Sequence, residues 1–322
     1  MTELDARRPT RELLTMLGLP DGDLEASYVS PKRFPDGAHY RVEIPSVEGP
    51  RCVEAVLSEA ERLDVPVTRV SQGTGVGLLT DREILDMVAM TAAAGVELSL
   101  FARPCAAWDA SAMARAPAGG VIGSAVRGQD QMTAAVDEMR RAADLGVRSV
   151  LVADVGLLSV FGRLRAAGEL PADMQAKVSV MMPVANPASA AVMVALGADT
   201  LNLPSDFTLG QVAAVRSAVS VPLDIYVESP DTIGGMVRHY ELPRLVVVAA
   251  PVYIKFGLRN APDVYPSGTH IEDLTVALSR ERVRRARLGL DLLARSGSTE
   301  MCSGPGASGL ALPVAARVSG EA

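Results

Sequence analysis

The segment M-T-A-A-V-D-E-M-R-R-A-A-D-L-G-V-R-S-V-L-V-A, Met132 to Ala153, carries the pattern that decides the fold. Apolar residues recur at helical spacing over Met132–Leu145, Gly146 follows, and Ser149–Ala153 is a short apolar run. Glycine after a helix fits the left-handed residue that closes it. A short apolar run between turn signals is typical of a strand that is buried on both faces. The segment therefore predicts a helix, a turn and a buried strand.

The same alternation continues along the chain from about residue 39. The predicted strands are Tyr40–Ile44, Thr68–Ser71, Glu97–Ala102, Ser149–Ala153, Lys177–Met182, Thr200–Leu203, Leu223–Val227 and Leu245–Ala249. The predicted helices are Cys52–Leu63, Asp81–Ala94, Met132–Leu145, Val155–Ala167, Ala188–Leu196, Leu209–Ala218 and a short one at Ile233–Tyr240. Thr80 to Glu83 gives the second helix a polar start with acidic residues in its first turn.

Eight strand and helix units over roughly 260 residues match the count and size of a TIM (β/α)8 barrel. A doubly wound open sheet is the alternative, but it usually has fewer units, and no Gly-x-Gly-x-x-Gly follows the first strand. We expect a single barrel domain at residues 39–296, with an N-terminal extension at 1–38 that caps its bottom. Residues 297–322 are rich in Gly, Ala and Ser, which predicts a disordered tail. The insert at 104–128 is either an active-site cover or a disordered excursion.

Composition limits the classes of partner and cofactor. The net charge of −7 argues against nucleic acid, which needs clustered Lys and Arg. Three distant cysteines, Cys52, Cys105 and Cys302, argue against a disulfide scaffold, a zinc site or an iron–sulfur cluster. No signal-like core and no run of about 18 apolar residues occur, so we expect a cytoplasmic protein without a membrane segment. The expected partner is a small-molecule substrate, and a homo-oligomer stays open.

Polar residues stand where the predicted strands end, and in a barrel these ends converge on the face that carries the active site. The candidate catalytic residues are Glu43, Asp154, Glu228 and Lys255. The candidate substrate-binding residues are Gln72, Arg103, Asn186, Asn202, Gly234, Gly235, Tyr253, Asn260 and His270. Single members have structural interpretations, such as a turn-forming Asp154, but their shared position predicts an enzyme.

The segment Ala249–His270 is interpreted as a long loop after the eighth strand. Lys255 and Arg259 give it positive charge, and Gly234-Gly235 in the preceding loop allows backbone N–H groups to approach an anion. Barrels often bind phosphate with the loops after strands seven and eight. We therefore expect a small anionic substrate, a carboxylate or a phosphate; the alternative is a rigid lid with surface charges.

Three mechanisms fit these residues. Lys255 could form a Schiff base, although its predicted place beyond a strand argues against this. Glu43, Asp154 and Glu228 could hold a divalent metal and a water. Glu228 or Asp154 could act as a general base beside Lys255 or Arg103 as an anion anchor. The three histidines are scattered, so no Ser-His-Asp arrangement is proposed.

Four segments resemble the collagenase-like peptidases of family U32 over about residues 120–230. They are Ala125–Gln131, Leu151–Leu158, Ala185-Asn186-Pro187 and Leu196-Gly197-Ala198. The resemblance implies a barrel and peptide hydrolysis, and it carries over Asp154 and Asn186 as site positions. Some members of the family bind an iron–sulfur centre through clustered cysteines, which this chain lacks.

The sequence thus predicts a TIM-barrel enzyme, a hydrolase by resemblance, that acts on a small polar or anionic substrate. The first alternative is lyase or aldolase chemistry that uses Lys255 or a carboxylate-bound metal. The second is a non-catalytic barrel that binds a partner protein.

Overall fold

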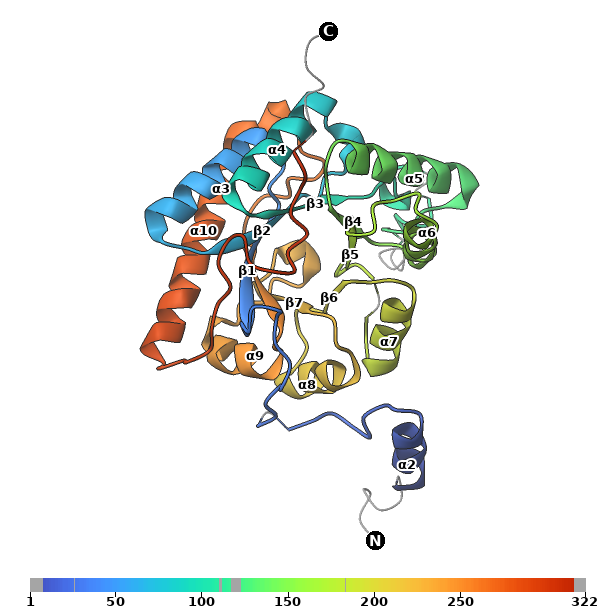
Figure 1. The fold of residues 1–322 in the computed structure, drawn as a ribbon, viewed down its shortest axis with the longest axis vertical. Coiled ribbons are helices and arrows are strands. Elements are labelled where there is room, and N and C mark those ends of the chain that lie inside the picture. Colours follow the sequence, from blue (N-terminus) through green and yellow to red (C-terminus); the bar gives the residue numbers. More distant parts are fainter. Residues whose placement is uncertain (1–7, 26, 110–111, 117–122, 183, 316–322) are drawn as a thin grey trace.

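The computed structural model describes residues 8–25, 27–109, 112–116, 123–182 and 184–315. Within these residues, eight parallel strands close into a barrel in the order β1-β2-β3-β4-β5-β6-β7-β8. Helices surround the ring of strands (Figure 1). The predicted TIM barrel is confirmed.

Each strand pairs only with its neighbours along the chain, and β8 pairs with β1 to complete the ring. The strands are β1 (Tyr40–Pro45), β2 (Val67–Ser71), β3 (Glu97–Phe101), β4 (Ser149–Val152), β5 (Gln175–Val178), β6 (Thr200–Asn202), β7 (Leu223–Glu228) and β8 (Val252–Phe256). All are short and almost wholly buried, as expected for a sheet between a packed interior and an outer layer of helices.

The helices are α2 (Arg8–Met16), α3 (Pro50–Leu63), α4 (Asp81–Ala94), α5 (Gly128–Asp144), α6 (Val155–Ala166), α7 (Pro187–Ala195), α8 (Leu209–Ala218), α9 (Leu242–Val248) and α10 (Glu272–Arg295). Short 3-10 turns are η1 (Val76–Leu78), η2 (Ala106–Trp108), η4 (Asp231–Ile233), η5 (His239–Glu241) and η6 (Thr269–Ile271). Thr80 and Glu83 form a reciprocal capping box at the start of α4, as predicted. Gly95 closes the same helix in the left-handed conformation.

The predicted eighth strand is wrong. Leu245–Ala249 lies mostly in α9, and the strand begins only at Val252. Pro243 stands in the first turn of α9, a position that favours a helix. Lys255 is therefore a strand residue. The predicted short helix at Ile233–Tyr240 is replaced by parts of η4 and η5 with extended chain between them.

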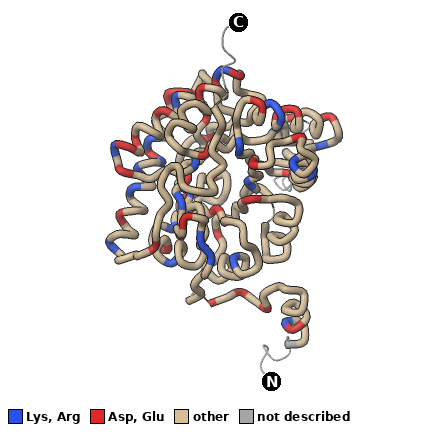
Figure 2. The backbone as a smooth tube through the Cα atoms, in the orientation of Figure 1, with Lys and Arg blue, Asp and Glu red and all other residues tan. Residues whose placement is uncertain are grey.

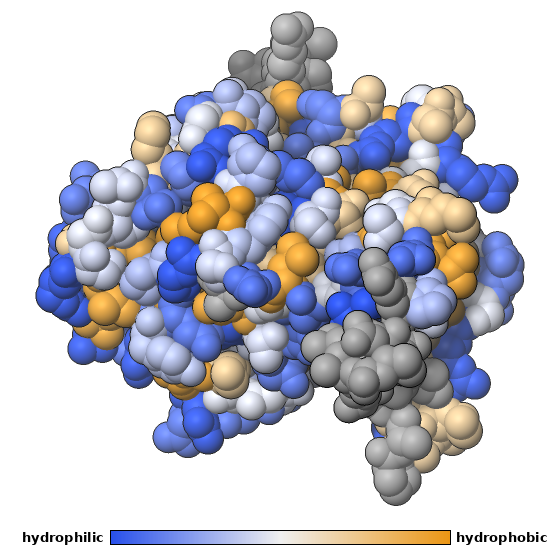
Figure 3. Space-filling model, turned by 90° about the horizontal axis from the view of Figure 1, so that it is seen from below, coloured by the Kyte–Doolittle hydropathy of each residue, from blue (hydrophilic) through white to orange (hydrophobic). Residues whose placement is uncertain are grey.

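The remaining predicted strands overlap β1 to β7, and the other predicted helices overlap α3 to α8. Charged residues lie mostly along the outer helices, but some positions on the strands of the barrel are also charged (Figure 2). On the face seen in Figure 3, apolar residues are scattered among hydrophilic ones.

Residues 297–315, here called the C-terminal strap, were expected to be disordered but pack against the barrel. Ser303 donates its N–H to the Tyr40 carbonyl at 3.0 Å, and Gly306 donates to Gly95 at 2.7 Å. Val314 donates to the Gly146 carbonyl at 2.8 Å. The prediction failed because small residues that suit a flexible tail also suit close backbone contact. Residues 316–322 lie outside the described residues.

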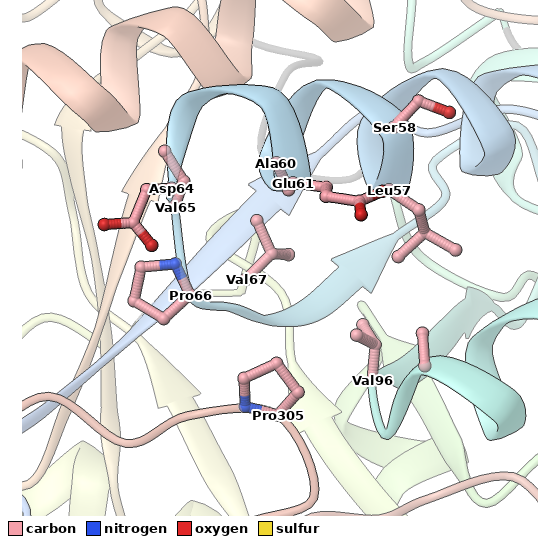
Figure 4. Close-up of a pocket in the computed structure, with 11 residues that line it drawn as sticks. Leu57, Ser58, Ala60, Glu61, Asp64, Val65, Pro66, Val67, Val96 and Pro305 are labelled. Carbon is pink, nitrogen blue, oxygen red and sulfur yellow. The ribbon is translucent and has the colours of Figure 1, made fainter.

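The strap also borders a groove of about 580 Å3 between α3 and β2 (Figure 4). Leu57, Val65, Val67 and Pro305 line it, with Glu61 and Asp64 beside them. In the described part of the chain, no helix is both long and apolar enough to cross a membrane.

Candidate active site

A cavity of about 350 Å3 opens where the carboxyl ends of the strands meet. Its lining comes from seven strands or the loops that follow them, and includes Ser46, Gly73, Phe101, Arg103, Trp108, Leu151, Ser179, Tyr226, Asp263 and Tyr265. Barrel enzymes build their active sites at this face. The cavity is therefore the candidate active site.

Arg103 is held rigidly in the cavity wall. Its guanidinium carbon lies 4.2 Å from the ring centre of Phe101 and 3.6 Å from that of Trp108. Its Nε donates to the Gly73 carbonyl at 3.2 Å, and its Nη1 donates to Cys105 Sγ at 2.6 Å. Such stacked and hydrogen-bonded arginines have little freedom left to lose when they bind an anion.

Glu43, Lys177 and Lys255 form a buried cluster in the barrel interior. The Lys177 ammonium pairs with Glu43 Oε1, and Lys255 Nζ lies 3.4 Å from the same oxygen. Lys255 also donates to Asn202 Oδ1 at 2.8 Å. Ser71 donates its hydroxyl to Glu43 Oε1 at 2.7 Å. One carboxylate therefore binds two lysines.

This lysine cluster adjoins the cavity. Lys255 Nζ lies 4.2 Å from the ring centre of Tyr226, which lines the cavity. Lys177 lies two residues before Ser179, which is also a lining residue. Lys255 thus lies directly behind Tyr226, and the cluster borders the cavity although its three members are not among the described lining residues.

Lysine is rare in this sequence, which makes two buried lysines in one cluster a notable feature. Lys32, Lys177 and Lys255 are the three lysines among 31 Lys and Arg residues of the chain. Arginine stays protonated in proteins, whereas a buried lysine can lose its proton. Two of the three side chains that can act as neutral amines are therefore inside the barrel. The rarity of lysine could already be seen in the sequence.

A second set of charges lies in the same interior. Arg69 Nε pairs with Glu97 at 2.7 Å, and its Nη1 pairs with Asp224 at 2.7 Å and with Glu43 at 3.3 Å. The guanidinium carbon lies 3.5 Å from the ring centre of Tyr253. Arg69 thereby balances three buried carboxylates from β1, β3 and β7.

These surroundings change the proton affinity of the cluster. Burial, together with the charges of Lys255 and Arg69, lowers the pKa of Lys177 to about 7, although Glu43 acts in the opposite direction. Burial alone would raise the pKa of Glu43, but Lys177, Lys255 and Arg69 together lower it. Interacting groups of this kind titrate as a unit. Near neutral pH the cluster can therefore hold one neutral amine beside an ionised carboxylate.

The lowered pKa of Lys177 predicts a pH-dependent contribution to stability. The unfolded chain binds this proton up to about pH 10.5, the ordinary pKa of lysine, whereas the folded protein releases it near 7. Unfolded chains thus bind more protons across this window, and the free energy of unfolding rises with pH. One such group contributes at most about 1.4 kcal/mol per pH unit.

Urea unfolding of the wild type and of Lys177→Met at pH 7, 8 and 9 measures this contribution. The wild-type free energy of unfolding should rise more steeply with pH than that of the variant. Titrating groups that lie apart from the cluster, such as Cys302, cancel in the difference. Parallel curves would show that the lysine keeps its ordinary pKa.

Three of the residues predicted from the sequence, Glu43, Asn202 and Lys255, meet in the cluster, and Arg103 lines the cavity. Gln72 supports Arg103 indirectly, because its amide oxygen accepts the Gly75 N–H at 3.0 Å and its amide nitrogen donates to the Gly75 carbonyl at 3.2 Å. A side chain at Gly75 would lie 3.1 Å from Arg103, so this turn packs directly on the arginine.

Glu228 is buried away from the cluster. Its Oε1 accepts the Arg259 N–H at 3.0 Å, and its Oε2 lies 3.5 Å from His239 and 3.7 Å from Arg285 of α10. The pairing of β7 with β8 shifts register between Tyr226 and Glu228. Such a shift interrupts the strict alternation of side chains and turns Glu228 toward the helices.

Asp154 and Asn186 cap helices. Asp154 accepts the Leu157 N–H at 2.8 Å at the start of α6, and also the Val126 N–H at 3.1 Å. Asn186 accepts the Ser189 N–H at 2.9 Å at the start of α7, and it is exposed. In both residues a side-chain oxygen accepts a backbone N–H group at a helix start.

The other predicted residues lie apart from the cluster. Tyr253 is buried toward the amino ends of the strands, where it contacts Phe34 and Arg41. Gly234 and Gly235 close the η4 turn, and Asn260 donates its N–H to Asp231 at 2.5 Å. His270 is exposed in η6.

No group of three or more His, Cys, Asp or Glu side chains that could hold a metal ion occurs among the described residues. Glu43, Asp154 and Glu228, the set predicted for a metal, each have separate partners. These donors therefore do not fit the expected metal site.

Comparison with known proteins gives one family. Residues 121–230 match the model of peptidase family U32. The chain is similar to family U32 over this segment. No curated protein sequence matches it.

Solved structures of similar fold include a U32 peptidase, which has 18% identity and a TM-score of 0.41 over 72% of this chain and 97% of its own. A Coccidioides immitis protein assigned as a fructose-1,6-biphosphate aldolase has 13% identity and a TM-score of 0.50 over 81% of this chain and 91% of its own. A truncated 3-deoxy-D-arabino-heptulosonate 7-phosphate synthase from Thermotoga maritima has 13% identity and a TM-score of 0.47, over 85% and 98%. These likenesses concern the barrel fold alone.

The segment matched by U32 runs from the residues before α5 to the end of β7. It contains Lys177, Ser179 and Tyr226, but Glu43, Arg103 and Lys255 lie outside it. The candidate site therefore combines residues from the U32 segment with residues from the rest of the barrel.

Proposed function

We propose that the protein is a lyase-type enzyme in which the buried lysines bind a small carbonyl compound as an imine. The observation that carries this proposal is the pairing of Lys177 and Lys255 with one carboxylate, Glu43, beneath a cavity at the strand carboxyl ends. A lysine that is desolvated or lies next to another cation is the usual form of an activated amine. Because Lys255 lies within β8, the objection that it follows its strand no longer applies.

The roles follow from the electrostatics. Lys177, with its lowered pKa, supplies the neutral amine, and Lys255 is assigned the role of proton donor. The Lys177 nitrogen attacks the carbonyl carbon and forms a carbinolamine. A proton from Lys255 lets the oxygen leave as water, which gives a protonated imine. That cation can accept the electron pair of a neighbouring bond as it breaks.

Reductive trapping tests this proposal. The protein is incubated with glyoxylate or pyruvate and cyanoborohydride, and the adduct is located by mass spectrometry of peptides. We expect an adduct on Lys177 that is lost in Lys177→Met. Lys32→Met is the matched control, because Lys32 donates to carbonyls of Arg216 and Val219 far from the cluster. An adduct on Lys255 would exchange the two roles, and no adduct on either lysine would overturn the proposal.

The family match favours a second candidate, a U32-type hydrolase that uses a carboxylate as general base. Glu228→Gln separates the two functions, because Glu228 is buried outside the lysine cluster. If the enzyme is a hydrolase with this base, the variant loses release of peptides from gelatin. If the imine proposal holds, the variant keeps the wild-type yield of trapped adduct.

A further inference from the structure

The loops after β7 and β8 do not offer the phosphate site that such barrels often have. Gly234 donates its N–H to the Asp231 carbonyl at 3.2 Å, and Gly235 donates to the Pro230 carbonyl at 3.0 Å. The N–H of Asn260, in the next loop, donates to the Asp231 carboxylate at 2.5 Å. These three amide groups are thus already engaged with protein oxygens.

Charge in these loops also opposes a phosphate. The Asp231 carboxylate lies 3.6 Å from Arg259 and so offsets its charge. Asp263 contributes a further carboxylate to the cavity lining. A phosphate monoester carries nearly two negative charges at neutral pH, so like-charge repulsion disfavours it here.

Arg103 is the single cation among the described residues that line the cavity. Two of its nitrogens have the partners given above, while Nη2 has no hydrogen-bond partner in the described part of the protein. One planar guanidinium with a spare donor suits one carboxylate.

The rest of the lining is largely apolar. Phe101, Leu151, Val180, Met181, Tyr226 and Ile233 contribute to it. Such walls favour a ligand with a sizeable apolar group, because water is released from both surfaces.

We infer that the substrate is an oxo acid with a bulky apolar side chain, and not a phosphorylated sugar. Arg103 binds its carboxylate, and the apolar walls bind its side chain. This inference rests on the proposed function for the position of the carbonyl group, which faces the lysine cluster. The binding positions of the substrate's carboxylate and of its apolar side chain are inferred from the cavity lining alone.

Calorimetric titration with ligands that lack a carbonyl tests the assignment separately from imine formation. The ligands are 3-phenylpropanoate, propanoate, 3-phenylpropan-1-ol and 2-phenylethyl phosphate. We expect 3-phenylpropanoate to bind at least about 10-fold more tightly than propanoate, because the ring buries apolar surface. It should also bind at least about 10-fold more tightly than the phosphate ester.

Arg103→Met should weaken binding of 3-phenylpropanoate by about 10- to 100-fold, the range for a charged hydrogen bond. Binding of the alcohol should not change. Arg259→Met is the matched control, since it removes an arginine beside Asp231 and should leave 3-phenylpropanoate binding unchanged. Trp108→Ala is a second variant that removes an exposed ring from Arg103, and it should weaken binding several-fold without affecting folding.

Two results would overturn the inference. One is binding of the phosphate ester as tight as that of the carboxylate. The other is loss of carboxylate binding in Arg259→Met but not in Arg103→Met. If 3-phenylpropanoate binds as expected and reductive trapping labels no lysine, the cavity assignment stands and the imine proposal fails.

Discussion

Replacing Arg69 with methionine is expected to destabilise the protein by about 3–5 kcal/mol or more, the cost of leaving a buried ion pair without its partner. Arg69 is fully buried and pairs with Glu43, Glu97 and Asp224. Its loss would leave three carboxylates inside the barrel with fewer cations. Because whole domains are stable by only about 5–15 kcal/mol, the variant should unfold at much lower urea concentration.

Urea unfolding followed by far-ultraviolet circular dichroism measures this effect. Arg82→Met is the control, since Arg82 is exposed and pairs with Asp86 one turn along α4. Its cost should stay within about 0.5 kcal/mol, as for an ordinary surface pair. A loss below about 1 kcal/mol in Arg69→Met would mean that the interior charges do not depend on this arginine.

Gly146→Ala is expected to cost about 3 kcal/mol, from two separate causes. Gly146 has a φ of 99°, and left-handed backbone costs a residue with a side chain about 1–2 kcal/mol. A Cβ atom there would also lie 2.1 Å from the Val314 carbonyl oxygen, so the C-terminal strap would have to move.

Gly168→Ala provides the matched control for the backbone term. Gly168 has a φ of 78°, but a Cβ atom there would meet nothing within 4 Å. Its cost should be only that of the backbone, about 1–2 kcal/mol. The difference between the two variants, in urea unfolding, measures the docking of the strap. Equal costs would show that the strap contributes nothing at this position.

The sequence was sufficient for the fold because apolar runs alternate with helix patterns, and glycine separates the helix from the strand at Gly95, Gly146 and Gly197. It failed at β8, where inward positions carry Tyr253 and Lys255. These polar residues made the strand resemble a loop, and the apolar run before it, now α9, resembled a strand. A pattern of apolar and polar residues cannot tell a charged barrel interior from solvent.

The same limit applies to the candidate site. Glu43 and Lys255 were found because they lie close to the carboxyl ends of strands or beyond them in the predicted scheme, but Lys177 was missed because it is the first residue of its predicted strand. Glu228 was selected from its position in β7, yet a shift of register directs it toward α10. Strand position alone does not determine which way a side chain points.

The C-terminal strap has a consequence for the biosynthesis of the protein. Arg41 of β1 donates to Ser303 of the strap at 3.1 Å, and 262 positions separate the two residues. A ribosome that adds ~5–20 residues per second leaves roughly 10–50 s between their appearance. Arg41 of the first strand therefore lacks its partner in the strap throughout the synthesis of the other seven strands.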